Sequence, residues 1–288
     1  MALRTGPISG IEIIHRADPE IRLEPAHGAW GAEKPTDPPV AISHGIGDVS
    51  VDGMRHVMNI GMRVSYFAPV DGGIAIRIRN LDPAGPVHLV RVERPGYDYV
   101  VSYEFPPEQP AYRRDVEIAA FAHALTVRGT RLMAHGCGVV VGDGRGVICL
   151  GTSGAGKSTA SRMLDGYSGI RLLNDDRLVI ERRPTGFHLW GTPWPGTAGV
   201  ARAGDAPLSK IALISQGIRH ESRRLSRREA LGRVLPTLAL PIWDQSLMGE
   251  ALEFVDELLA RVPVVELRYP LDPTTQGWLA ETLTEDRW

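Results

Sequence analysis

The stretch Gly151-Thr152-Ser153-Gly154-Ala155-Gly156-Lys157-Ser158-Thr159 matches the phosphate-binding motif G-x-x-x-x-G-K-[ST] at every defined position. Residues 147–150 before it form a short apolar run, and residues 160–164 after it favour a helix. A strand, a glycine-rich loop and a helix in this order let backbone N–H groups point at phosphate oxygens, beside the positive end of the helix. The stretch therefore predicts an α/β domain that binds a nucleoside triphosphate.

Two side chains of the motif have separate expected roles. Lys157 would reach the β- and γ-phosphates, and the Ser158 hydroxyl would ligate Mg²⁺. The alternative is a turn rich in glycine and serine that contains a lysine by chance, which the flanking strand and helix disfavour. The residues predicted to bind the nucleotide are Gly151, Ser153, Gly154, Ala155, Gly156, Lys157, Ser158 and Thr159.

Composition excludes several classes of protein. The 288 residues are 43% hydrophobic and 23% charged, as in ordinary globular proteins, and the net charge of -2 favours neither nucleic acid nor an anionic membrane. No run of about 18 apolar residues could span a bilayer, and the first residues lack the apolar core of a signal peptide. Cys137 and Cys149 lie in apolar, strand-like contexts, and we expect both to be buried and reduced. We therefore expect a cytoplasmic protein with no nucleic-acid or membrane partner.

The first part of the chain, residues 1–111, reads as a β-rich module. Alternating apolar residues predict strands at 62–67, 73–78, 88–92 and 97–103, and residues 1–50 are too irregular to assign. The proline-rich segment 106–110 is the best linker candidate.

Residues 112–288 read as the α/β domain, because strands and helices alternate around the phosphate loop. Glycines at 142–146 predict a hairpin turn rather than a dinucleotide-binding loop, since they lie between two strands. The expected strands are 137–141, 147–150, 170–173, 178–180, 211–215 and 264–269, and the expected helices are 115–125, 160–164, 227–235, 247–261 and 274–284.

An acidic pair, Asp175 and Asp176, follows the strand expected at 170–173. An acid at the end of a strand beside a phosphate loop normally helps to hold Mg²⁺, and a second carboxylate can take the proton from an attacking hydroxyl. The alternative is a solvated turn, because Asn-Asp-Asp is ordinary turn chemistry.

The order of these segments resembles the bacterial HPr serine kinase/phosphorylase family. His135-Gly136, the hairpin, the phosphate loop and then Asn174-Asp175-Asp176-Arg177 follow that family's order and spacing. The resemblance implies a P-loop, HPr-kinase-like (phosphoenolpyruvate-carboxykinase-like) nucleotide-binding domain that uses ATP and Mg²⁺ to phosphorylate a serine hydroxyl. It also implies that Asp175 joins Ser158 on Mg²⁺ and that Asp176 is the general base. Lys157 would act on phosphate, and His135 would contact the base and tune its charge.

Two departures from that family bear on the substrate. First, the family's E-x-R-G-x-G segment is not found after the acidic pair. In its place, residues 189–196 read Leu-Trp-Gly-Thr-Pro-Trp-Pro-Gly. Second, the β-rich first part does not look like the family's N-terminal domain. Both disfavour HPr as the substrate. The Gly-x-Pro-Trp-x-Gly form is similar to HPr-kinase-like proteins of peptide-modification clusters, including kinases of the C-terminal serine of lasso-peptide precursors. We therefore expect a peptide or protein partner with an acceptor serine, which residues 1–111 help to receive.

Several interpretations stay open at this point. The chain could be a small-molecule kinase of the same fold, or a nucleotide-gated binding module with slow hydrolysis, and a homo-oligomer is not excluded. Trp190 and Trp194 either line a substrate groove or anchor the core. His123 is expected to be a core or surface histidine rather than a ligand or catalytic residue. The basic segment 219–228 is expected to be a solvated face leading into a helix, with an anion clamp as the alternative.

Overall fold

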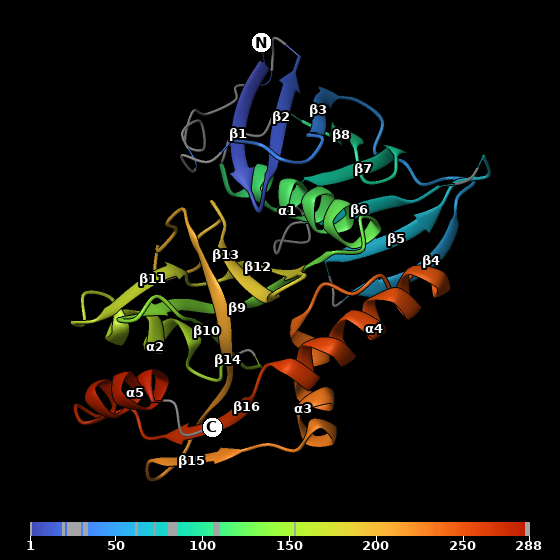
Figure 1. The fold of residues 1–288 in the computed structure, drawn as a ribbon. Coiled ribbons are helices and arrows are strands. Elements are labelled where there is room, and N and C mark those ends of the chain that lie inside the picture. The colour runs from blue at the N-terminus through green and yellow to red at the C-terminus, as the bar shows by residue number, and fades with distance from the viewer. Residues whose placement is uncertain are drawn as a thin grey trace. The chain divides into compact units, whose positions relative to one another are not determined.

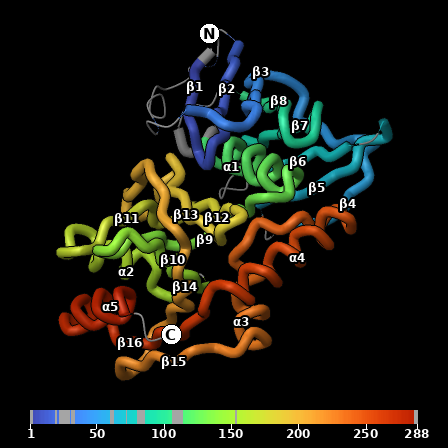
Figure 2. The backbone as a smooth tube through the Cα atoms, viewed as in Figure 1, coloured from blue at the N-terminus to red at the C-terminus, as the bar shows by residue number. Residues whose placement is uncertain are grey.

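The computed structural model describes residues 2–18, 21, 30, 34–60, 63–71, 73–79, 86–105, 110–152 and 154–285. Its fold is mixed α/β, as predicted, with two eight-stranded sheets (Figure 1). The chain forms two compact units, and each can be followed by colour in Figure 2. We call Met1–Arg128 with Pro241–Gln245 the N-terminal unit, and Gly129–Leu240 with Ser246–Trp288 the phosphate-loop unit.

The N-terminal unit is one sheet in the order β1-β2-β3-β8-β7-β6-β5-β4, with helix α1 packed against β3, β6 and β7. The four strands predicted between residues 62 and 103 are confirmed as β5 to β8. Its elements are β1 (Ala2–Ile8), β2 (Ile11–Ala17), β3 (Val40–Ile46), β4 (Arg55–Ile60), β5 (Val64–Ala68), β6 (Ala75–Arg79), β7 (Val87–Arg94), β8 (Asp98–Tyr103) and α1 (Pro110–Val127).

Helix α1 belongs to the N-terminal unit rather than to the domain that follows it. Val116, Ala120, Phe121 and Ala124 are fully buried, and the helix packs on the sheet of that unit. The apolar face of the helix is thus buried against the sheet of this unit. The boundary therefore falls after Arg128, whereas the sequence placed it at residue 111, where the composition changes.

The phosphate-loop unit is built on the sheet β10-β9-β12-β13-β14-β16-β15, in which β11 also pairs with β9 and β10 also pairs with β14. The apolar side chains of its central strands alternate between two cores. Helices α3 and α4 cover one core, and α2 and α5 cover the other (Figures 1 and 2). Its elements are β9 (Arg131–Val141), β10 (Gly146–Leu150), α2 (Lys157–Leu164), β11 (Ile170–Asn174), β12 (Arg177–Arg183), β13 (Gly186–Gly191), β14 (Asp205–Gln216), β15 (Glu221–Arg224), α3 (Arg227–Val234), the short 3-10 helix η2 (Leu235–Thr237), α4 (Gln245–Arg261), β16 (Val264–Tyr269) and α5 (Thr275–Thr284).

The glycine-rich segment at 142–146 is a hairpin, as predicted. Strands β9 and β10 pair antiparallel on either side of it, and Cys137 lies directly opposite Cys149. Both thiols are free and fully buried, in agreement with the sequence. In the described part of the chain, none of the helices combines the length and the apolar character that crossing a bilayer requires.

Lys210, on β14, holds the end of helix α5. Its buried Nζ donates to the carbonyl oxygens of Thr282 at 3.1 Å, Leu283 at 3.0 Å and Glu285 at 2.7 Å. A helix leaves its last carbonyls without intrahelical partners, and a cation there also suits the helix dipole.

The Lys210→Met change keeps most of the buried volume but removes these bonds, so we expect the free energy of unfolding to fall by about 2 kcal/mol. Urea denaturation measures this, with Arg228→Met on an exposed position of α3 as a control that should change little; equal stability of both variants would contradict the role of Lys210.

Candidate functional site

The phosphate loop lies between the end of β10 and the start of α2, as the motif predicts. Gly154 and Gly156 have φ of 80° and 99°, in the left-handed region that glycine adopts readily. Gly151 packs so closely that a Cβ there would lie 2.9 Å from the carbonyl oxygen of Ile214. Glycine is thus required at these positions by the backbone itself. Ala155 belongs to the same loop and Thr159 to the first turn of α2, whereas Ser153 lies outside the described residues.

Lys157 is 8% exposed and folds back over its own loop. Its Nζ donates to the carbonyl oxygens of Gly151 at 2.7 Å and Thr152 at 3.0 Å. Burial lowers the pKa of Lys157, the charge of Asp176 raises it, and Arg177 lowers it further. The ammonium group therefore lies within electrostatic reach of Asp176.

Asn174 shapes the turn that carries the acidic pair. Its fully buried side chain accepts hydrogen bonds from the backbone N–H of Asp176 at 2.7 Å and of Arg177 at 2.8 Å. Its amide also donates to the carbonyl oxygen of Thr192 at 2.8 Å. Asp175 is only 3% exposed, so the alternative of a solvated turn is wrong. No function was predicted for Asn174, although a side chain that bonds its own backbone two residues on is typical of asparagine.

Asp175 organises the loop that follows β13. Its Oδ1 accepts hydrogen bonds from the N–H groups of Gly196 at 2.7 Å and Val200 at 3.1 Å, and its Oδ2 accepts one from Ala198 at 2.7 Å. Gly196 lies so close that a Cβ there would be 2.8 Å from Asp175 Oδ2. Sequence reasoning missed this structural role and assigned Asp175 only to Mg²⁺, which stays a prediction.

The Asp176 carboxylate faces His135. The His135 Nε2 atom on β9 lies 3.0 Å from Asp176 Oδ1, and Arg177 Nε lies 3.5 Å from Asp176 Oδ2. The pair comes together because β9 and β12 are neighbours and His135 is directly opposite Arg177. The side chains of His135 and Asp176 are 42% and 15% exposed, so a reactant can reach them from solvent. The resemblance implied this contact, and the catalytic roles of the two residues remain predictions.

A further contact joins the phosphate loop to the loop that Asp175 holds. Thr197 Oγ1 donates to Ser158 Oγ at 2.9 Å. Thr197 was not singled out from the sequence, since nothing local relates it to Ser158. Three segments separated in the sequence, namely 151–159, 174–177 and 192–200, therefore meet at one place.

Three other candidates from the sequence have buried side chains. Trp190 and Trp194 are 5% and 1% exposed, so they anchor the core and do not line a groove. Trp190 also donates from Nε1 to Glu181 Oε2 at 2.9 Å. His123 is buried, it bonds through Nδ1 to the Tyr99 hydroxyl at 2.8 Å, and burial lowers its pKa to about 4. A core position for His123 is thus confirmed.

The basic segment 219–228 contains strand β15 and leads into α3. Arg223 pairs with Glu229 at 2.8 Å and with Glu266 at 2.7 Å, and Arg227 pairs with Asp256. A solvated face leading into a helix is confirmed. Since these guanidinium groups already face carboxylates of the same unit, they do not form the anion clamp that was the alternative.

The matches to known proteins come from solved structures alone. No family model matches the chain, and no curated protein matches it. Among solved structures, the HPr(Ser) kinase/phosphatase from Coxiella burnetii is 13% identical with a TM-score of 0.31, and the match covers 52% of this chain and 93% of that chain. A proposal for the function therefore has to come from the residues of the site.

Proposed function

We propose that the phosphate-loop unit binds Mg-ATP and transfers the γ-phosphoryl group to a serine hydroxyl of a peptide or protein. The observation that carries this proposal is the meeting of a glycine-rich loop at a helix N-terminus with the solvent-accessible Asp176–His135 pair. A kinase needs a group to accept the proton of the acceptor hydroxyl, and the Asp176 carboxylate can supply it.

The residues present fit a nucleotide. A Cβ at Gly154 or Gly156 would meet nothing within 4 Å, so these glycines leave open space over the loop. Backbone N–H groups and a lysine at a helix N-terminus are the usual donors to phosphate oxygens. Lys157 would exchange its two carbonyl partners for phosphate oxygens, which are better partners for an ammonium group.

The chemistry assigned to each residue follows from its position. The Asp176 carboxylate accepts the proton of the serine hydroxyl as its oxygen attacks the γ-phosphorus, and ADP leaves. His135, bonded to the same carboxylate, orients it and tunes its charge. Ser158 and Asp175 would hold Mg²⁺, which when bound neutralises charge on the β- and γ-phosphates. Most of the catalysis is thus positioning and charge neutralisation.

The chemical class of the phosphate acceptor is inferred from the amino-acid sequence. The Gly191-Thr192-Pro193-Trp194-Pro195-Gly196 segment favours a peptide substrate over HPr, and the C-terminal serine of a ribosomal, lasso-type precursor is the specific proposal. The N-terminal unit would receive that peptide, and such a kinase would work in the cytoplasm.

One assay separates this proposal from its alternatives. The protein is incubated with Mg-ATP and either a synthetic peptide ending in serine, the same peptide ending in alanine, or free serine, and the products are read by mass spectrometry. We expect phosphate only on the peptide that ends in serine. Phosphoserine as the product would instead indicate a small-molecule kinase, and ATP hydrolysis without any phosphorylated acceptor would indicate a nucleotide-gated binding module.

A further inference from the structure

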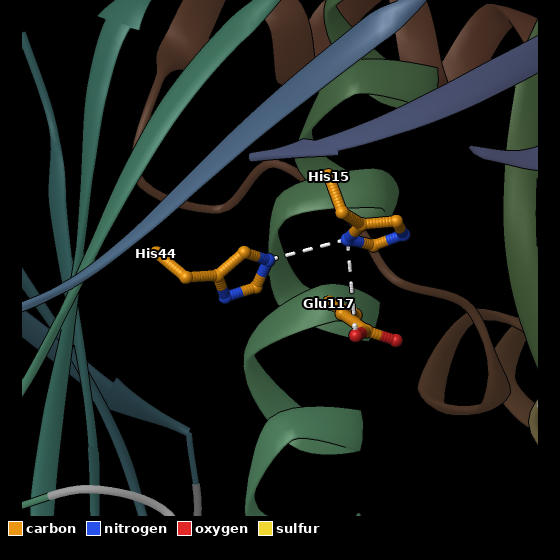
Figure 3. Close-up of side chains that lie close together, drawn as sticks. All are labelled: His15, His44 and Glu117. Carbon is orange, nitrogen blue, oxygen red and sulfur yellow. Dashed lines mark hydrogen bonds and ion pairs between the residues drawn. The ribbon is translucent and has the colours of Figure 1, made fainter. Parts of the chain in front are cut away.

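The core of the N-terminal unit contains a polar cluster that the proposed kinase chemistry does not use. His15 on β2, His44 on β3 and Glu117 on α1 are each 2% exposed (Figure 3). Burying a carboxylate and two imidazoles is costly unless their charges and lone pairs are compensated. A cluster of this kind therefore indicates a bound cation or a shared proton.

The strands bring the two histidines to the same face. His15 is paired with Ile42 and Ala17 with His44, so the rings are diagonal neighbours on parallel strands. Helix α1 packs against β3, and Figure 3 shows Glu117 pointing from that helix toward the rings. The sheet and the helix thus supply ligands from two directions.

The distances suit a small ion. His15 Nδ1 lies 3.2 Å from His44 Nε2 and 3.9 Å from Glu117 Oε1, and one donor atom of each residue lies within 4.8 Å of the others. Zinc bonds of about 2.0–2.2 Å at tetrahedral angles hold neighbouring ligand atoms about 3.3 Å apart. Small shifts of the side chains would therefore complete three corners of a tetrahedron.

The outer nitrogen of each ring has its own partner. His44 Nδ1 bonds to the Tyr103 hydroxyl at 2.8 Å, and His15 Nε2 lies 3.4 Å from Thr5 Oγ1. In a metal-binding histidine the ring nitrogen that does not bind the metal commonly donates its N–H to such a group. The other ring nitrogen then carries a lone pair that can bind the metal. In this arrangement the two lone pairs converge, together with the carboxylate, on one point.

We propose that His15, His44 and Glu117 bind a divalent transition-metal ion, Zn²⁺ in the first instance, as a structural site that ties β2 and β3 to α1. Two imidazoles select such an ion over Mg²⁺ or Ca²⁺, which prefer oxygen ligands. The carboxylate balances part of its charge, and a water molecule can fill the fourth position. Three protein ligands and a water are also the ligand set of catalytic zinc sites, but the burial of all three side chains closes the ion to a substrate from solvent, so a structural role is the one proposed. This proposal is independent of the kinase proposal, because the residues belong to the other unit.

The test uses the full chain, stripped of metal with a chelator and then titrated with ZnCl₂ in a calorimeter. We expect one zinc ion per chain, a rise in melting temperature on binding, and binding at least about tenfold weaker in Glu117→Gln and in His44→Gln. His56→Ala, on β4 of the same unit, and His135→Ala are controls that should bind as the unchanged protein does. Equal affinity in all four variants would overturn the proposal.

A second measurement does not depend on the stability of any variant. Co²⁺ bound in place of zinc by nitrogen and oxygen ligands in a tetrahedral site gives intense visible d–d absorption. We expect that absorption to saturate at one equivalent in the unchanged protein and to be displaced by Zn²⁺. Absence of both the absorption and zinc binding in the folded protein would mean that the cluster shares a proton instead of a metal, and would overturn the site.

Discussion

Replacing Asp176 by asparagine should abolish phosphoryl transfer while leaving nucleotide binding almost unchanged. The amide keeps the size and polarity of the carboxylate beside His135 but cannot accept the proton of the attacking hydroxyl. Because general-base catalysis contributes about 10²- to 10⁴-fold, we expect kcat to fall by about 10³-fold. The affinity for ATP, measured by calorimetry, should stay within about threefold, since Asp176 contributes no hydrogen-bond donor to the phosphates.

Two further variants make this result specific. Lys157→Ala should weaken both nucleotide binding and transfer, because it removes the cation from the loop. Asp165→Asn changes an exposed acid just after α2 and should leave both unchanged. If Asp176→Asn transferred phosphate at nearly the normal rate, the assignment of the base would be wrong.

The parts of the fold that could be predicted from the sequence are those fixed by neighbouring residues. The phosphate loop, the hairpin at 142–146 and the helices α3, α4 and α5 each follow from local patterns, whereas strands β13 and β15 were not predicted. The contact between His135 and Asp176 could also be anticipated, but only through a resemblance that kept their order and spacing. Local sequence alone left His135 as a residue at the edge of a strand.

Strands β2 and β3 were missed for a different reason. Each places a histidine, His15 or His44, on its buried face, and the polar residue interrupts the apolar alternation that marks a strand. The carboxylate beside these buried histidines comes from the opposing helix, which supplies Glu117, and the two strands alone do not reveal it. The same difficulty hid the boundary between the units, because the packing of α1 is a property of the whole sheet.

The site itself depends on contacts that no local pattern encodes. Thr197 reaches Ser158 across 39 positions of the sequence. Asn174 and Asp175 read as turn residues, yet both are buried because the segment 192–200 folds over them. In this site the residues with the most conspicuous pattern are those proposed to supply the chemistry, and inconspicuous residues set its geometry.

Asp175 is where these two roles can be separated by experiment. Its carboxylate accepts three backbone N–H bonds, from Gly196, Ala198 and Val200. In Asp175→Asn one oxygen becomes an NH₂ group that faces an N–H donor, so at least one buried bond is lost and a buried donor is left without an acceptor. With a charged acceptor removed as well, we expect the free energy of unfolding to fall by about 3 kcal/mol.

The decisive condition for this measurement is the absence of nucleotide and metal. Urea denaturation in excess chelator, with Asp165→Asn as the matched control, should show the full loss of stability in Asp175→Asn, and limited proteolysis should cut first within 192–200. If Asp175 acted only as a Mg²⁺ ligand, the metal-free variant would be as stable as the unchanged protein or more stable. A buried negative charge without its cation destabilises the folded state, and the asparagine removes that charge. Its defect would then appear only in the Mg²⁺ dependence of nucleotide binding. The sign of the change in unfolding free energy without metal therefore distinguishes the two roles. A loss of stability indicates that Asp175 holds the loop 192–200, and no loss indicates that it serves only as a Mg²⁺ ligand.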